Sequence, residues 1–337
     1  MFSFKLNKFV WDDLQKRLHC ELEEIDRLQH EFVQTKAVLN KSIGKLKQIG
    51  IIPDTNSNNS IDISTPYSNL SKLYFMQTSR SEKELGSAMK VYKDIRSNYS
   101  RYELKVDFIT QLHKELYSRY PIVAGKFKQD KNPMRNIIGD RMVGKTVETV
   151  SPENVGYYLE ELNEEFEKWF CNTEYHHLLL IIAYFNDFLM IHPFIDGNGR
   201  TSRVILTWLL LRAGYEVVRY YPLEDAIDRN RQGHTRNLEK SHDGWFEIKH
   251  DMFPLACFFL KALKQTYLSA HSSALRLAEF TEQFERIDNI LKAFNNNITI
   301  DQILSSDSKI KREMAKLFLA QVDRQLKKNK KSTPEFC

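Results

Sequence analysis

The 337-residue sequence contains few cysteines, glycines and prolines. Its four cysteines lie far apart and form no CxxC pair, so they suggest neither a zinc ribbon nor a disulfide framework and favour a reducing compartment. Twelve glycines and nine prolines are too few for a collagen-like or linker-like chain, and fewer than a turn-rich β protein needs. The composition therefore predicts an all-α protein.

The sequence also lacks a long uninterrupted hydrophobic run. Its most apolar stretch, residues 178–191, is interrupted by Asn186 and Asp187 and is too short to span a bilayer. The first residues contain no apolar stretch of signal-peptide length. We therefore expect a cytoplasmic protein that has no membrane partner.

Positive charge is concentrated near the C-terminal end. The net charge is +5, but residues 309–331 contain nine Lys or Arg against two acidic residues, a local net charge of +7. The rest of the chain therefore carries −2. A basic tail does not make the whole protein basic, so we expect nucleic acid to be contacted, if at all, only through residues 309–331.

Hydrophobic periodicity divides the chain into three expected parts. Apolar residues recur every three or four positions from 11 to 49, which predicts one long amphipathic helix. Turn-forming residues at 53–60 end this arm. The expected parts are a helical arm and linker at 1–60, a helical domain at 61–268 with its core at about 100–265, and a C-terminal helical region with a basic tail at 269–337.

Within these parts, helical patterns extend over 82–97, 103–119, 152–170, 174–191, 200–213, 223–240 and 245–268. Only residues 135–150 have the composition of strands. There, 136–138 and 145–150 are β-branched segments that flank a turn from Gly139 to Gly144. The sequence thus predicts one β-hairpin in an otherwise helical protein.

The most informative segment is 192–203, which reads HPFIDGNGRTSR and lies between two apolar helical segments. Pro193 disfavours helical backbone at the residue before it, so the preceding helix is expected to end near Ile191. The glycine-rich stretch 197–199 allows positive φ angles and a turn of inward-pointing N–H groups that binds anions. Arg200 and Arg203 lie on one face at the start of the next helix. These features predict a phosphate site.

Two further residues of this segment carry chemistry. Asp196 beside bound phosphates would be repelled by them unless a divalent cation lies between, so we assign Asp196 as a Mg²⁺ ligand. His192, with an ordinary pKa near ~6.5, is suited to take a proton from an attacking hydroxyl. This clustering is hard to explain by packing, because it would crowd charge against an apolar core. It indicates group transfer from a nucleotide.

Residues 192–203 match in full the HPFx[DE]GNGRxxR signature of the Fic domain family, and the resemblance extends over about 100–265. Residues 125–128 and 135–139 resemble the family's approach to its flap, which would be the predicted hairpin. The resemblance implies a helical protein adenylyltransferase with ATP and Mg²⁺. Such an enzyme moves AMP from ATP onto a Ser, Thr or Tyr hydroxyl of a target protein and releases pyrophosphate.

The resemblance also implies a role for each residue at a matching position. His192 would be the general base, Asp196 the Mg²⁺ ligand and Phe194 a residue that packs the loop into the core. The phosphates would be bound by Gly197, Asn198, Gly199, Arg200 and Arg203. The hairpin would bind the target by strand addition, through Ile137, Ile138 and Gly139. Modification of the protein itself and a homodimer are compatible with this assignment.

Two departures from the family pattern stand out. Some members inhibit themselves with a helix that carries [ST]xxxE[GN]. Residues 78–83 and 281–286 match its first five positions but then have a cation, and the first of them makes Glu82 the candidate inhibitory residue. In addition, His234 and Thr235 stand where many members have two tyrosines beside the base.

Two alternatives remain. Residues 139–146, GDRMVGKT, satisfy the P-loop pattern of an NTPase, although a P-loop must open a helix and the β-branched residues that follow do not favour one. Loss of nucleotide turnover in Lys145→Ala would support it. The other alternative is a Fic-derived regulatory or DNA-binding module at 298–326. Salt-dependent DNA binding that is lost on deletion after residue 308 would support that one.

Overall fold

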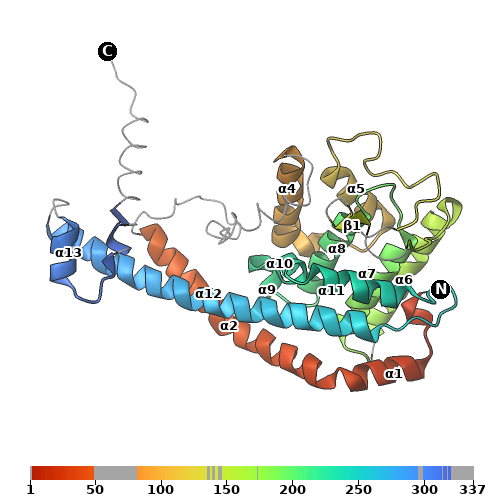
Figure 1. The fold of residues 1–337 in the computed structure, drawn as a ribbon, viewed down its shortest axis with the longest axis horizontal. Coiled ribbons are helices and arrows are strands. Elements are labelled where there is room, and N and C mark those ends of the chain that lie inside the picture. The colour runs from red at the N-terminus through yellow and green to blue at the C-terminus, as the bar shows by residue number, and fades with distance from the viewer. Residues whose placement is uncertain are drawn as a thin grey trace, which may run out of the picture. The chain divides into compact units, whose positions relative to one another are not determined.

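The computed structural model describes residues 2–48, 82–134, 137–138, 141–142, 146–172, 174–294, 299–312, 314–316 and 318–319. These residues form two compact units (Figure 1). The first contains 2–30 and 82–268, and the second contains 31–48 and 269–319. Two long helices contribute residues to both units, so the unit boundaries lie inside helices.

The all-α fold class is confirmed. The α-helices are α1 (Lys8–Arg17), α2 (His19–Gln48), α4 (Glu82–Asn98), α5 (Val106–Leu116), α6 (Val155–Asn172), α7 (His177–Ile191), α8 (Asn198–Arg212), α9 (Val217–Tyr220), α10 (Leu223–Asp228), α11 (Arg231–His242), α12 (Phe253–Ala293) and α13 (Ile300–Ser306). The described residues also form the short 3-10 helices η1 (Ser3–Lys5), η2 (Tyr99–Arg101) and η3 (Pro152–Asn154). In the described part of the chain, no helix has the length and apolar character needed to cross a membrane.

Helix α7 is the centre of the first unit. Every residue from Leu178 to Ile191 is buried, including Asn186 and Asp187. A helix that is apolar all round must be enclosed by other elements, and α7 packs against both α6 and α8. Because α8 begins only a few residues after α7 ends, the segment that joins them is held against this core.

The N-terminal arm is two helices rather than one. The chain leaves helical geometry at Leu18, which separates α1 from α2. Residues before it belong to the first unit because Phe2, Phe4 and Trp11 are buried there. The ring of Trp11 lies 5.3 Å from that of Trp169. The structure therefore divides the chain differently from the three parts expected from the sequence.

Two other helix boundaries differ from the sequence expectation. The predicted helix 223–240 is the pair α10 and α11, because the Asn230 side chain accepts a hydrogen bond from the Gly233 N–H at 3.1 Å and begins a new helix. The predicted helix 245–268 begins later, at Phe253, and continues without interruption to Ala293.

The predicted hairpin region contains two short strands, β1 (Ile137–Ile138) and β2 (Arg141–Met142). They pair antiparallel with Ile137 opposite Met142 and Ile138 opposite Arg141, and Met134 and Val147 form a further bridge. The second strand thus lies inside the segment expected to be a turn. The sequence could not set this register, because neither face of so short a strand carries a distinctive hydrophobic pattern.

The described residues in and after the GDRMVGKT segment do not fit the P-loop alternative, although 139–140 and 143–145 lie outside the description. Residues 141–142 of the GDRMVGKT segment are a β-strand, and no helix follows it, because Thr146–Val150 are extended or irregular apart from the bridge at Val147. A P-loop places its phosphate ligand at the N-terminus of a helix that follows it directly. The β-branched residues at 146–150 favour extended backbone instead.

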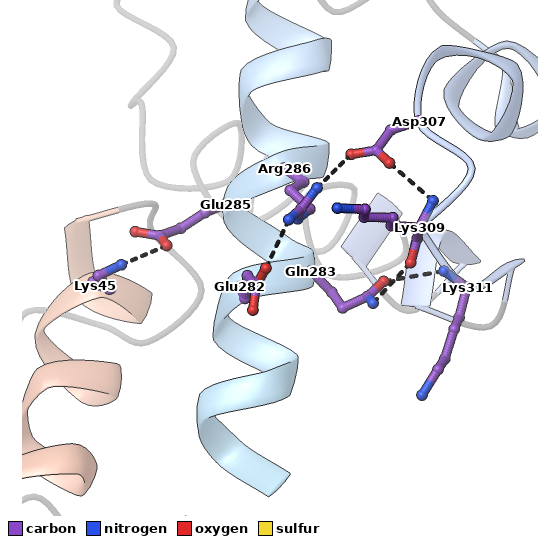
Figure 2. Close-up of polar contacts among 8 residues, drawn as sticks. All are labelled: Lys45, Glu282, Gln283, Glu285, Arg286, Asp307, Lys309 and Lys311. Carbon is purple, nitrogen blue, oxygen red and sulfur yellow. Dashed lines mark hydrogen bonds and ion pairs between the residues drawn. The ribbon is translucent and has the colours of Figure 1, made fainter. Parts of the chain in front are cut away.

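The second unit has its own apolar core, formed by Ile287, Leu291, Ile303, Ile310, Met314, Ala315 and Phe318. Figure 2 shows the polar contacts beside it. Arg286 on α12 donates hydrogen bonds to Glu282 at 2.7 Å and to Asp307 at 2.9 Å. Glu285, the acid of the second inhibitory-motif match, pairs with Lys45 at 2.6 Å. Glu285 is therefore occupied within this unit.

Candidate active site

His192 terminates α7 with a left-handed backbone conformation, φ 51° and ψ 58°. Its Nδ1 lies 3.2 Å from the Leu189 carbonyl oxygen and donates to it, so the lone pair of the neutral imidazole is on Nε2. Burial, together with the positive charge of Lys128, lowers the pKa of His192 to about 4. The side chain is therefore an unprotonated base at neutral pH.

The loop after His192 is held by a stack of rings. Phe194 is fully buried, and its ring lies 3.8 Å from that of His113 on α5, nearly parallel to it. His113 Nε2 donates to the Asp196 carbonyl at 3.0 Å, and its Nδ1 accepts the Gly125 N–H at 2.9 Å. Burial lowers the pKa of His113, which favours this neutral form. No sequence pattern indicates this role, because a lone histidine on a helix is usually a packing residue.

The Asn198 side chain lies inside the loop. Its Oδ1 accepts the Phe194 N–H at 2.9 Å, and its Nδ2 donates to the Phe194 carbonyl at 2.6 Å. Only 2% of Asn198 is exposed. Its side chain therefore holds the loop closed, and the part of Asn198 left for the expected phosphate contact is its main-chain N–H.

We expect Asn198→Ala to destabilise the fold by about 2–4 kcal/mol. The substitution leaves the Phe194 N–H without its partner, at ~1–3 kcal/mol, and removes one of the two donors to the Phe194 carbonyl, which keeps Asn132 Nδ2 at 3.1 Å. Asn198→Asp keeps the acceptor but removes the donor, so its free energy of unfolding should lie between those of Asn198→Ala and the wild type. Urea denaturation measures both. Wild-type stability of Asn198→Ala would show that the two hydrogen bonds are dispensable.

Gly197 is the residue that turns the chain into α8. It has φ 85°, and a Cβ on it would lie 2.3 Å from Cε2 of the Tyr117 ring. Asn198 and Gly199 already have right-handed helical geometry. Of the three positions 197–199 that could take a positive φ, only Gly197 does so. The remaining N–H donors of the anion site are the unpaired N–H groups at the start of α8.

A cavity of about 770 Å³ opens at this helix start. The residues lining it include Asp196, Gly197, Gly199, Arg200 and Arg203, which the sequence assigned, together with Arg119, Arg231 and His234, which it did not assign. Four arginines against Asp196 and Asp228 make the cavity electropositive and suit an anionic ligand. Arg119 and Arg231 are far from the motif in sequence, so no spacing pattern could have identified them.

A second cavity, of about 750 Å³, lies beside residues 146–148 and the C-terminal half of α11. His242 lines it and is buried, and its Nε2 has no hydrogen-bond partner among the described residues. Burial lowers the pKa of His242 to about 3, and the neighbouring His250, His192 and His234 contribute. Helix α11 therefore borders both cavities, since His234 lines the first.

Asp196 is the one sequence-assigned metal ligand. Its side chain is exposed at the cavity, and Oδ1 accepts the Gly197 N–H at 2.7 Å. Within the described ranges, no group of three or more His, Cys, Asp or Glu is placed to hold a metal ion. A single carboxylate at this arginine-lined cavity fits Mg²⁺ that is shared with the phosphates of a bound nucleotide.

The remaining assigned residues are placed only in part. Ile137 and Ile138 form β1, whereas Gly139 lies outside the described residues. Glu82 is the first residue of α4, and its side chain is also outside the description. Target docking by the hairpin and inhibition by Glu82 therefore stay predictions.

Buried titratable groups predict that stability falls in mild acid. Burial lowers the pKa values of His192, His234, His242 and His250 to about 3 or 4. Between the unfolded value near ~6.5 and these values, the unfolded chain binds protons that the folded chain does not, so unfolding is favoured as pH falls. Burial raises the pKa of Asp187 to about 7 and of Asp225 to about 6, which has the opposite effect.

We therefore expect the Tm to decrease from pH 7 to pH 4.5, because four histidines outweigh two aspartates. Asp187→Asn removes one opposing group, so its Tm should fall more steeply over the same range. Thermal denaturation across this pH range measures both curves. A Tm independent of pH, or a shallower slope in Asp187→Asn, would contradict the assignment.

Comparisons with known proteins agree with this geometry. Residues 103–210 match the Fic/DOC family model. The chain is 37% identical over 123 residues to "Protein adenylyltransferase Fic" of Drosophila willistoni, covering 35% of this chain and 22% of that protein. For the protein of the same name from Drosophila yakuba, the identity is 35% over 148 residues, with coverage of 42% and 26%. The chain thus spans about a fifth to a quarter of these relatives.

Solved structures share the fold at low sequence identity. A Fic domain containing signaling protein from Bacteroides thetaiotaomicron superposes with a TM-score of 0.51 at 17% identity, covering 74% of this chain and 96% of that one. A Fic family protein from Desulfovibrio desulfuricans has a TM-score of 0.51 at 19% identity, with coverage of 87% and 89%. At this identity the likeness shows the fold alone.

Proposed function

Because residues 103–210 of this chain form a domain of the Fic/DOC family, we propose that the protein is a protein adenylyltransferase that moves AMP from ATP to a hydroxyl side chain of a target protein. The observation that supports this most strongly is the geometry at the α7–α8 junction. Asp196, Arg200 and Arg203 line one cavity, while the neighbouring His192 is an unprotonated base.

In this proposal the phosphates of ATP lie at the N-terminus of α8. The helix start and the Gly197 turn provide N–H donors, and Arg200 and Arg203 bind the outer phosphates. Asp196 would hold Mg²⁺, which neutralises phosphate charge when bound. Arg119 and Arg231 add positive charge to the same cavity and favour retention of the β and γ phosphates. The nucleoside would lie along α11, where the family resemblance places the base.

The proposed reaction is an in-line displacement at the α phosphate. The hydroxyl oxygen of the target bonds to the α phosphorus, the bond to the bridging oxygen breaks, and pyrophosphate leaves. His192 Nε2 takes the hydroxyl proton. The low pKa of His192 keeps this nitrogen unprotonated before reaction, and the negative charge of bound phosphates would raise it toward the range of an effective base.

Target binding is proposed at the hairpin. Strand addition to β1 or β2 uses main-chain hydrogen bonds, so it aligns a target hydroxyl with the α phosphate and requires little sequence in the target. The protein itself is one accessible target, so self-modification is the simplest assay.

The function is tested with ATP labelled at either the α or the γ phosphate, in the presence of Mg²⁺. We expect protein labelling from α-labelled ATP, none from γ-labelled ATP, and strong reduction in Asp196→Asn. Labelling from the γ position would instead indicate a kinase, and labelling from neither, with added candidate targets, would contradict the proposal. Glu82→Gly in the same assay tests the inhibitory helix, with increased labelling as the expected result.

A further inference from the structure

Lys128 is a buried cation that no part of the motif predicts. It lies in the segment that joins α5 to β1, and only 3% of it is exposed. Lysine is almost never fully buried unless its ammonium is paired. Here its Nζ donates to the Ile191 carbonyl at 3.1 Å and to Thr149 Oγ1 at 2.9 Å. The carbonyl that it binds belongs to the last residue of α7.

The main chain of Lys128 contacts the other side of His192. Its N–H donates to the Pro193 carbonyl at 2.9 Å, next to the bridge between Phe127 and Phe194. One residue therefore binds the carbonyls immediately before and immediately after His192. Between them, His192 has a left-handed conformation that is uncommon for residues other than glycine and that costs free energy unless the surroundings stabilise it.

The same contacts extend to the rest of the loop. Thr149 Oγ1 donates to the Asn132 carbonyl at 2.9 Å, and Asn132 Nδ2 donates to the carbonyls of Phe194 and Ile195 at 3.1 and 2.8 Å. The Lys128 ammonium also interacts favourably with the negative end of the α7 helix dipole, because it lies at the C-terminus of that helix. Lys128, Thr149 and Asn132 thus form one hydrogen-bonded network that contacts the main chain on both sides of His192.

We propose that Lys128 is a positioning residue for His192, which holds the two flanking carbonyls so that the imidazole points toward the reacting hydroxyl. The proposal rests on the proposed function, because it assumes that His192 is the general base. The Lys128 ammonium is charged at neutral pH, since burial lowers its pKa only to about 8. The described residues include no acidic partner for it, so its charge acts on His192 without local neutralisation.

A purely structural role makes a different prediction. If Lys128 only stabilised the fold, its replacement would lower the Tm and the active fraction, with kcat per folded molecule unchanged. If it positions His192, the replacement changes kcat while the affinity for ATP is retained, because Arg200 and Arg203 come from α8. It also raises the pKa of His192, because a nearby positive charge is removed. The other titratable groups acting on this imidazole are Asp196 and His242.

The test uses Lys128→Met, with Lys128→Arg as the conservative variant and the exposed Lys126→Met as the matched control. In full-length protein with ¹³C-labelled histidine, NMR titration measures the pKa of His192, and transfer of α-labelled AMP gives kcat and KM. We expect Lys128→Met to lower kcat by ~10²-fold, the effect of a small misplacement of a catalytic group, with KM for ATP within about twofold and a higher pKa of His192. Lys128→Arg should recover most of kcat, and Lys126→Met should match wild type.

The proposal would be overturned if Lys128→Met changed neither the pKa of His192 nor kcat. It would also be overturned if the control variant Lys126→Met lowered kcat as much as Lys128→Met does. If Lys128→Met does not fold, Thr149→Val removes one acceptor of the ammonium and should still change kcat without changing KM. Absence of transfer in the wild type contradicts the proposed function instead. The NMR titration would then still report whether Lys128 controls the environment of His192.

Discussion

His192→Ala is expected to abolish AMP transfer and to leave the affinity for ATP nearly unchanged. The imidazole is the unprotonated group that ends α7, whereas the residues proposed to bind phosphates lie on the turn and on α8. General-base catalysis contributes about 10²- to 10⁴-fold to a rate. Transfer of label from α-labelled ATP and calorimetric titration with a non-hydrolysable ATP analogue measure the two quantities separately.

Two further variants show whether the loss is chemical. His192→Asn should be equally inactive but better folded, because asparagine tolerates the left-handed conformation that this position requires. His19→Ala, at an exposed position of α2, should behave as wild type. If His192→Asn is folded and transfers AMP at the wild-type rate, His192 is not the base.

Gly197→Ala is expected to eliminate binding of ATP and to lower the Tm. A non-glycine residue at φ 85° costs ~1–3 kcal/mol. Its Cβ would also lie 2.3 Å from the Tyr117 ring, closer than any real contact. Either Tyr117 leaves its stack on His113, at 4.8 Å, or the loop moves, and both displace the start of α8. Thermal denaturation and ATP titration measure the effect.

The control for this variant is Gly86→Ala on α4, where an added Cβ meets no atom within 4 Å. It should keep the wild-type Tm or raise it slightly, because alanine favours helix. The double variant Gly197→Ala/Tyr117→Leu should recover part of the Tm by relieving the overlap while the backbone cost stays. A wild-type Tm and ATP affinity in Gly197→Ala would show that the turn is not constrained as described.

The candidate site was predictable because most of it lies within twelve consecutive residues. Pro193 sets the end of α7 at Ile191, and the glycines set the start of α8 within a few residues, both by local backbone sterics. The arginines of this short segment follow a glycine turn at the start of a helix. A helix N-terminus binds anions, so the local sequence is enough to predict a phosphate site.

The supporting residues could not be predicted in the same way. His113, Lys128 and Asn132 come from α5 and the segment after it, and each donates a hydrogen bond to a main-chain carbonyl in the motif or directly beside it. Every residue has a main-chain carbonyl, so the sequence does not show which carbonyl a distant side chain will bind. Arg119, in the turn after α5, and Arg231, the first residue of α11, likewise reach the cavity only through tertiary packing.

The sequence by itself determined the all-α class, the position of the α7–α8 junction and the residue types that gather there, because these depend on hydrophobic period and on the backbone limits of proline and glycine. Only the tertiary structure decided how those residues are used. It turned the Asn198 side chain inward onto Phe194, placed Lys128 against the carbonyls beside His192, and packed the N-terminal residues into the first unit. These contacts form because buried polar groups need hydrogen-bond partners. Which groups become buried together depends on how distant segments of the chain pack.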